Sequence, residues 1–232
     1  MSRISATFER LRQKKEKALI PFITAGYPDL GTTRRLIFQS EQCGADLLEL
    51  GVPFSDPMAD GPIIQQASEI ALARGTSLER ILGLVKAVRR KSSIPIILMG
   101  YYNPFFKFGL KAFTRAAQDS GVDGLLIVDL PPEEAVEMKM HTDSAGLDLI
   151  FLLTPTSGPE RINSIVKHAS GFIYYVSLTG VTGVRSTLDR TIRNQLETIR
   201  KKSPLPIGVG FGISTPEHAK TVARWADAVV VG

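Results

Sequence analysis

Short apolar runs recur about every 20 to 40 residues, and amphipathic stretches of helical period lie between them. The runs lack clean alternation with polar residues, which indicates strands buried on both faces. Several follow a motif that ends a helix, such as Gly44-Ala45-Asp46 or Gly121-Val122-Asp123. The predicted strands are Leu19–Thr24, Asp46–Leu50, Pro95–Met99, Gly124–Val128, Asp148–Leu152, Phe172–Val176, Pro206–Gly210 and Asp227–Val231.

Repeats of a strand followed by a helix predict an α/β protein with a (β/α)8 fold, the TIM barrel, as a single domain over residues 1–232. An open doubly wound sheet is the alternative. It would normally need fewer strands and a Gly-rich fingerprint, which Thr24-Ala25-Gly26-Tyr27-Pro28 does not provide. The last predicted strand reaches almost to Gly232. We therefore expect the eighth helix to be absent from the given sequence and the domain to be incomplete at its C-terminus.

Composition and charge narrow the range of functions. The net charge of +5 is spread over several predicted helices and interspersed with acids, so we expect no nucleic-acid binding. No apolar run approaches the roughly 20 residues of a membrane span. Residues 1–17 lack the apolar core of a signal peptide, so we expect a cytoplasmic protein without membrane contact. Cys43 is the only cysteine, which excludes an intrachain disulfide and fits a reducing compartment.

A carboxylate interrupts the apolar run of the second predicted strand. Alternation along the strand sends Leu48 and Leu50 to one face, and Glu49 with Leu47 to the other. Apolar surroundings should raise the pKa of Glu49 toward neutrality, which suits a group that both donates and accepts a proton. The alternative is a structural ion pair with a nearby Arg or Lys.

The loop after this strand returns a second carboxylate, Asp60, toward the same end of the predicted barrel. Two acids in different surroundings are what separate proton donor and acceptor roles require. Asp60 could instead cap the helix that begins near Pro62, and for this residue alone capping is the favoured interpretation.

Glycine-containing loops follow the last three predicted strands and indicate a phosphate site, because glycines let backbone N–H groups approach an anion closely. Ordinary turn glycines are the alternative. Ser214 and Glu217 stand at capping-box spacing, with a proline between them in the first helical turn. The three loops are Gly180-Val181-Thr182-Gly183, Gly210-Phe211-Gly212-Ile213-Ser214 and Gly232.

Apolar side chains near the strand ends predict a cavity mouth for a flat substrate with a phosphate tail. One of Tyr174 and Tyr175 must point inward. No lysine lies near a strand end on this side, which argues against a Schiff-base aldolase. The histidines lie on predicted helices, and no metal-ligand spacing occurs, so we expect no metal. The predicted lining residues are Phe22, Met99, Tyr101, Leu152 and Phe211.

Five motifs, in order and spacing, resemble the tryptophan synthase alpha subunit family along nearly the whole chain. The most specific is the run from Leu48 through Pro57 to Gly61. The resemblance implies a (β/α)8 lyase of tryptophan biosynthesis that cleaves indole-3-glycerol phosphate into indole and glyceraldehyde 3-phosphate by a retro-aldol reaction. The other four motifs are Pro21–Gly26, Gly100–Pro104, Gly180–Gly183 and Gly210–Ser214.

The resemblance also implies residue roles. Glu49 would protonate indole carbon 3 and then accept the proton of the glycerol hydroxyl. Asp60 would stabilise the charge that develops on the ring nitrogen, and a lid would begin near Thr179. The implied substrate contacts are Phe22, Met99, Tyr101, Leu152, Tyr174 and Thr182. The implied phosphate contacts are Gly183, Phe211, Gly212 and Gly232, and the family normally continues after the last of these with a serine and a further helix.

A partner is implied as well. The family's β subunit binds pyridoxal phosphate and joins the α subunit in an αββα complex. Pro53 and Asp56 would contact this β subunit. The α chain would need no cofactor of its own. A stand-alone lyase and a purely regulatory subunit are the alternatives. The presence of both Glu49 and Asp60 disfavours the regulatory subunit.

Overall fold

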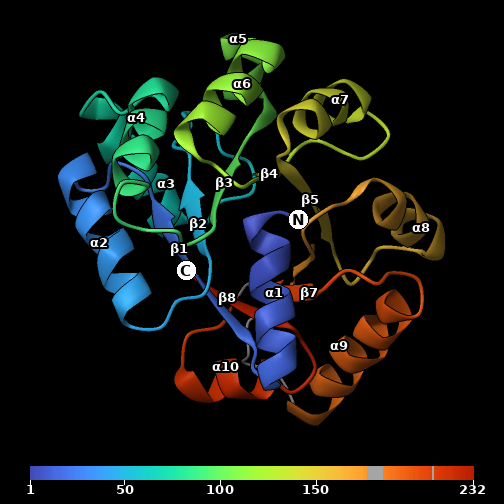
Figure 1. Cartoon of the computed structure of the whole chain (residues 1–232). Coiled ribbons are helices and arrows are strands. Elements are labelled where there is room, and N and C mark those ends of the chain that lie inside the picture. Colours follow the sequence, from blue (N-terminus) through green and yellow to red (C-terminus); the bar gives the residue numbers. More distant parts are fainter. Residues whose placement is uncertain (177–184, 211) are drawn as a thin grey trace.

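Eight parallel strands form a closed barrel in chain order, surrounded by helices (Figure 1). The computed structural model describes residues 1–176, 185–210 and 212–232, without the side chains of residues 185–191. The strands are β1 (Ala18–Thr24), β2 (Leu48–Gly51), β3 (Ile96–Gly100), β4 (Gly124–Ile127), β5 (Asp148–Leu153), β6 (Ile173–Val176), β7 (Ile207–Gly210) and β8 (Ala228–Val231). The helices are α1 (Arg3–Lys14), α2 (Leu30–Gln42), α3 (Pro62–Ala73), α4 (Leu78–Val88), α5 (Tyr102–Phe108), α6 (Leu110–Ser120), α7 (Val136–Ala145), α8 (Pro159–His168), α9 (Arg185–Arg200) and α10 (Pro216–Val222).

The predicted fold class is confirmed. Each strand pairs in parallel with its chain neighbours, and β1 closes the barrel by pairing with β8. The doubly wound alternative is wrong, because a closed barrel leaves no edge strand. All the predicted strands are found, with ends displaced by two residues or fewer.

Side chains along the strands alternate between two apolar cores. Leu48 and Leu50 belong to the outer core, between the strands and the helices. Leu47 lies in the core that fills the barrel, which confirms the face expected for Glu49. Tyr174 also belongs to this inner core and Tyr175 to the outer one, so Tyr174 is the tyrosine that points inward.

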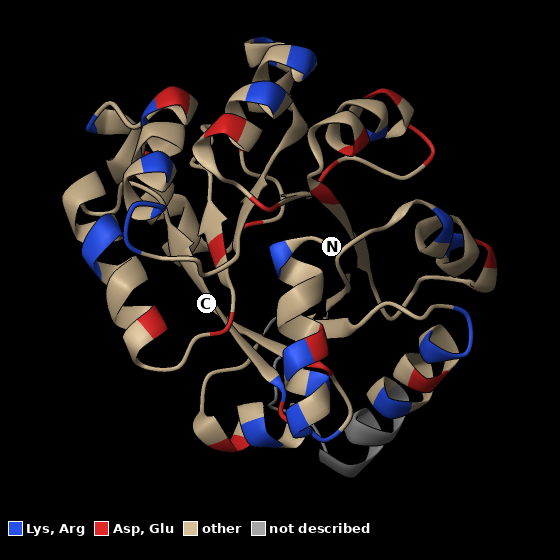
Figure 2. Cartoon of the chain, viewed as in Figure 1, with Lys and Arg blue, Asp and Glu red and all other residues tan. Residues whose placement is uncertain are grey.

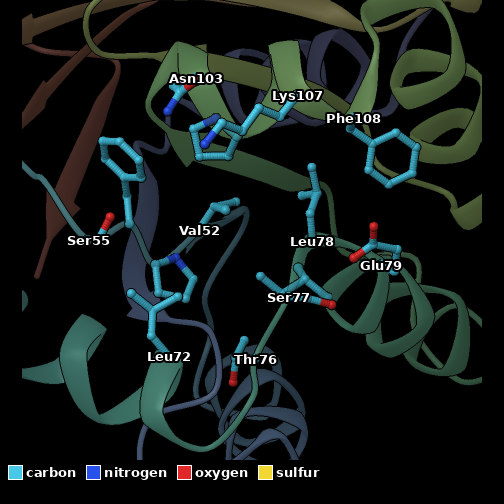
Figure 3. A pocket seen from close by; sticks show the side chains of 14 residues that line it. Val52, Ser55, Leu72, Thr76, Ser77, Leu78, Glu79, Asn103, Lys107 and Phe108 are labelled. Carbon is cyan, nitrogen blue, oxygen red and sulfur yellow. The ribbon is translucent and has the colours of Figure 1, made fainter.

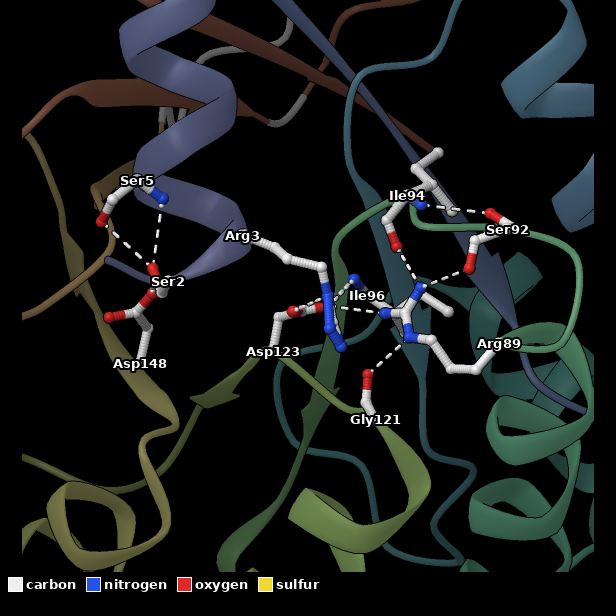
Figure 4. A network of polar contacts seen from close by, with 10 residues as sticks. All are labelled: Ser2, Arg3, Ser5, Arg89, Ser92, Ile94, Ile96, Gly121, Asp123 and Asp148. Atoms are coloured by element: carbon white, nitrogen blue, oxygen red, sulfur yellow. Dashed lines mark hydrogen bonds and ion pairs between the residues drawn. The ribbon is translucent and has the colours of Figure 1, made fainter.

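Helix α1 lies across the N-terminal end of the barrel (Figure 1) and is held there by polar contacts (Figure 4). The buried Asp123 carboxylate accepts hydrogen bonds from Arg3 Nε at 2.8 Å, from Arg89 at 2.5 Å and from the backbone N–H of Ile96 at 2.7 Å. The aspartate of a helix-ending motif thus joins two strand starts to the helix. This end of the barrel therefore serves stability.

The distribution of charge, the length of the helices and the cap of α10 were also predicted. In the view of Figure 2, Lys and Arg are spread over several helices and interspersed with acids. No helix in the described ranges has the length and apolar content of a membrane span.

The predicted cap of α10 is wrong by one residue: Thr215, not Ser214, accepts a hydrogen bond from the N–H of His218, at 3.2 Å. Because Pro216 takes the first helical position, the cap is the residue before it.

Candidate active site

Glu49 points from β2 into the barrel and is 2% exposed. Burial among apolar side chains raises the pKa of its carboxyl to about 8. Within the described part of the chain, no Arg or Lys contributes to this pKa, so the ion-pair alternative finds no support there. A carboxyl group in this setting holds its proton at neutral pH and can give it up.

Aromatic side chains flank this carboxyl. Phe22 on β1 is the register partner of Glu49. Tyr174 on β6 is 4% exposed, and burial, followed by the charge of Glu49, raises the pKa of its phenol well above the ordinary value. Gly210 admits this phenol, because a Cβ atom at Gly210 would lie 2.1 Å from the Tyr174 hydroxyl oxygen. The glycine and the tyrosine therefore form one wall of the site.

Asp60 lies on the loop between β2 and α3 and is half-buried. Burial raises the pKa of its carboxyl, and a hydrogen bond with the Tyr101 phenol lowers it. The same phenol oxygen accepts the N–H of Ala59 at 2.9 Å. The capping alternative for Asp60 is wrong, because Gly61 is the N-cap of α3 and no side chain caps this helix.

A small cavity joins Asp60 to the inward strand residues. It encloses about 20 Å³, and its lining includes Asp60 with three predicted substrate contacts, Phe22, Met99 and Tyr101. Its volume is close to that of one water molecule. Thr24 also lines it and was missed, although alternation from Phe22 along β1 could have found it.

The other predicted substrate contacts are divided. Leu152 on β5 and Tyr174 on β6 both pack against the inner core, but neither lines the small cavity. Thr182 lies outside the described residues. Ser68, on α3, lines the cavity and is 4% exposed. No local pattern marks Ser68, because its position depends on how α3 packs against the barrel.

The predicted phosphate contacts that the structure describes lie at the ends of neighbouring strands. Gly212 follows β7 and has a φ of +71°, a conformation that favours glycine. Gly232 follows β8, and a Cβ atom there would lie 3.9 Å from Cδ1 of Phe22. Gly183 and Phe211 lie outside the described residues. The two described glycines thus stand on the same end of the barrel as Glu49.

A cleft of about 390 Å³ opens beside the loop after β2 (Figure 3). Pro53 lines it, together with Asn103 and Lys107 of α5 and residues that precede and begin α4. Asp56 is exposed on the same loop, and the Ser55 hydroxyl donates to its carboxylate at 2.5 Å. The predicted partner contacts thus lie in and near one cleft.

The three histidines lie on α7, α8 and α10, as the sequence predicts. Among the described residues, no group of three or more His, Cys, Asp or Glu side chains could hold a metal ion.

These features define a class of protein. Two carboxylates of unlike surroundings stand at the C-terminal end of a closed (β/α)8 barrel, and a carboxyl group with a pKa of about 8 can donate or accept a proton near neutral pH. The fold and the site therefore define a (β/α)8-barrel protein with a candidate acid–base site.

Comparison with known proteins gives the family. Residues 8–232 match the family described as tryptophan synthase alpha chain. The tryptophan synthase alpha chains of Geotalea daltonii and Citrifermentans bemidjiense are 60% and 59% identical over all of this chain, which covers 88% and 87% of their lengths. The crystal structure of tryptophan synthase subunit alpha from Legionella pneumophila superposes with a TM-score of 0.93 at 44% identity, covering 100% of this chain and 86% of that one. The chain belongs to the tryptophan synthase alpha chain family.

Membership in this family identifies the reaction. The chain is a carbon–carbon lyase of tryptophan biosynthesis, and its reaction cleaves indole-3-glycerol phosphate. The family also implies a β subunit as partner.

Proposed function

We propose that Glu49 is the acid–base group of this cleavage and that Asp60 is its electrostatic partner. The supporting observation is the position of Glu49, which is buried at the active end of the barrel with a pKa of about 8. With that pKa, about nine in ten molecules carry the proton at pH 7. The group can therefore act first as an acid and then as a base.

The proton transfers balance in this scheme. The Glu49 carboxyl protonates indole carbon 3, which places positive charge on the ring nitrogen. The resulting carboxylate then accepts the proton of the hydroxyl on the glycerol carbon bonded to the ring. As that carbon becomes an aldehyde, the pair of electrons of the carbon–carbon bond returns to the ring. Neutral indole and glyceraldehyde 3-phosphate leave, and Glu49 has regained its proton.

In this scheme Asp60 stabilises the positive charge of the ring nitrogen and transfers no proton. Its carboxylate accepts the ring N–H and is attracted most strongly when the ring nitrogen is positive, which favours the transition state over the bound substrate. Its half-buried position strengthens this attraction, because water screens it less. Glu49 therefore needs a raised pKa, whereas Asp60 needs to be ionised.

The remaining predicted contacts complete the substrate site. We propose that Phe22, Met99 and Leu152 pack against the indole ring and that Tyr174 borders the acid–base group. Thr182 would contact the substrate from the loop after β6. The phosphate would bind the backbone N–H groups after the last three strands, from Gly183, Phe211, Gly212 and Gly232. Because the small cavity encloses only about 20 Å³, side chains or the loop that carries Asp60 must move to admit the ring.

The β subunit would bind at the cleft beside the loop after β2. Pro53 lines this cleft and Asp56 is exposed next to it, so one loop would carry both Asp60 and partner contacts. Occupation of the cleft would therefore bias the position of Asp60. We propose an αββα complex in which the β subunit holds pyridoxal phosphate and this chain needs no cofactor.

Assay of indole from indole-3-glycerol phosphate, with and without the β subunit, tests the reaction and the coupling together. We expect turnover in both cases and faster turnover with the partner. Equal rates would contradict the coupling and favour a stand-alone lyase. Absence of indole in both cases would leave only a regulatory role and would contradict the proposed acid–base function.

A further inference from the structure

The loop that carries Asp60 has few attachments. Within the described residues, two hydrogen bonds of its backbone tie residues 53–60 to the rest of the chain, besides the one between the Asp60 carboxylate and the Tyr101 phenol. Gln65 Nε2 donates to the Asp60 carbonyl oxygen at 2.8 Å, and the Ala59 N–H donates to the Tyr101 hydroxyl at 2.9 Å. The second bond reaches from this loop to the residue that follows the neighbouring strand, β3. The position of the Asp60 carboxylate therefore depends strongly on Tyr101.

Tyr101 is itself held firmly. It follows β3, is 3% exposed and is the N-cap residue of α5. The next backbone N–H, that of Tyr102, donates to the Asp129 carboxylate at 2.7 Å. The Tyr101 ring also packs against Phe54 of the loop, with ring centroids 5.3 Å apart. The phenol is thus fixed from the strand side and from the loop side.

The Tyr101 hydroxyl has one proton and faces two groups of the loop. Its oxygen accepts the Ala59 N–H, so its own proton is free to be donated to the Asp60 carboxylate. Burial raises the pKa of the phenol, and the charged groups that face it, Asp60 and Asp129, raise it further, so it keeps its proton. It is therefore a donor to Asp60 whenever Asp60 is ionised.

We propose that Tyr101 is a positioning residue that sets the location and the ionisation of Asp60, beyond any contact of its ring with the substrate. The inference rests on the proposed role of Asp60. The hydroxyl holds the backbone before Asp60 and the carboxylate itself, so a single atom on a rigid strand end aims the carboxylate at the ring nitrogen. A hydrogen bond to the ionised form also favours that form.

Tyr101→Phe tests the proposal, because it removes the hydroxyl and keeps the ring. We expect kcat for cleavage to fall about 10- to 100-fold, the effect of a hydrogen bond to a charged group, while KM changes less than about threefold. The acidic limb of the pH profile of kcat should move to higher pH, because loss of the donor raises the pKa of Asp60. Unchanged kcat, or an unmoved acidic limb, would overturn the proposal.

Tyr102→Phe is the matched control. It is the same change at the next residue, whose ring stacks on Phe106 with centroids 5.7 Å apart. No hydrogen bond of its hydroxyl is found within the described residues. We expect kcat, KM and the pH profile of this variant to match those of the unaltered chain. If both changes lowered kcat equally, the loss would reflect general disturbance of the β3–α5 junction, and the proposal would be wrong.

A double-mutant cycle with Asp60→Asn separates this inference from the function on which it rests. If Tyr101 acts through Asp60, Tyr101→Phe should have little further effect on kcat in the Asp60→Asn background. The same fold loss in both backgrounds would overturn the positioning role. Near-normal activity of Asp60→Asn alone would instead contradict the proposed function of Asp60.

Thermal unfolding of each variant shows whether it is folded at the assay temperature. Should Tyr101→Phe fail to fold, Ala59→Pro removes the same hydrogen bond from the donor side and leaves the ring intact. A fall in kcat with KM kept supports the proposal, and unchanged kcat overturns it.

Discussion

Removal of the Glu49 charge should stabilise the folded chain at alkaline pH while it abolishes turnover. The ordinary pKa of a glutamate is 4.5 and the folded value is about 8. The folded state therefore binds the Glu49 proton more tightly than the unfolded state. The stabilisation that the folded state gains from binding this proton is fully present below pH 4.5 and is lost as pH rises to about 8. This pKa difference corresponds to a loss of about 5 kcal/mol in the free energy of unfolding, which is an upper value because the site can relax.

Urea unfolding of the unaltered chain and of Glu49→Gln between pH 4.5 and 9.5 measures this loss. The stability of the variant minus that of the unaltered chain should grow by up to about 1.4 kcal/mol per pH unit and level off above pH 8. Glu69→Gln, at an exposed position on α3, should show no such growth. A difference that stays flat with pH would mean that burial does not raise the pKa of Glu49, and the acid role would lose its basis.

Three further changes test other parts of the account. Gly210→Ala places a Cβ atom 2.1 Å from the Tyr174 hydroxyl and should lower kcat/KM at least about tenfold, whereas Gly83→Ala, with no atom near its Cβ, should not. Asp123→Ala leaves the mostly buried Arg89 without its ion-pair partner and the Ile96 N–H without its acceptor, and should cost about 3 kcal/mol in urea unfolding without changing KM; a loss below 1 kcal/mol would contradict its role. Asp56→Lys should weaken binding to the β subunit about tenfold in titration calorimetry, and unchanged affinity would remove this residue from the interface.

Much of the fold follows from local sequence pattern. The strands are apolar runs of limited length between helix-ending glycines, and a strand buried on both faces has few other ways to satisfy its backbone. Alternation along β2 alone separates Glu49 from Leu48 and Leu50, and the structure keeps that separation. A charge at a position that must be buried is visible in one sequence, because burial without a function or partner is costly.

Contacts between segments that are far apart in the sequence could not be predicted in the same way. Tyr101 and Ala59 stand 42 residues apart, and nothing in either segment indicates the hydrogen bond between them. Ser68 enters the cavity only because α3 packs over the barrel mouth. The predicted cap of α10 is wrong by one residue because capping-box spacing indicated Ser214, whereas Pro216 occupies the first helical position and makes Thr215 the cap. These outcomes depend on tertiary packing rather than on local preference.

The most direct test of the account is single-turnover cleavage of indole-3-glycerol phosphate by Glu49→Gln, in parallel with its binding by calorimetry. Glutamine keeps the size of the side chain but cannot donate and recover the proton. We expect substrate affinity within about threefold of that of the unaltered chain and cleavage slowed at least about 1000-fold, within the range of general acid–base catalysis. Cleavage at a near-normal rate with normal binding would show that another group moves the proton and would contradict the central role of Glu49.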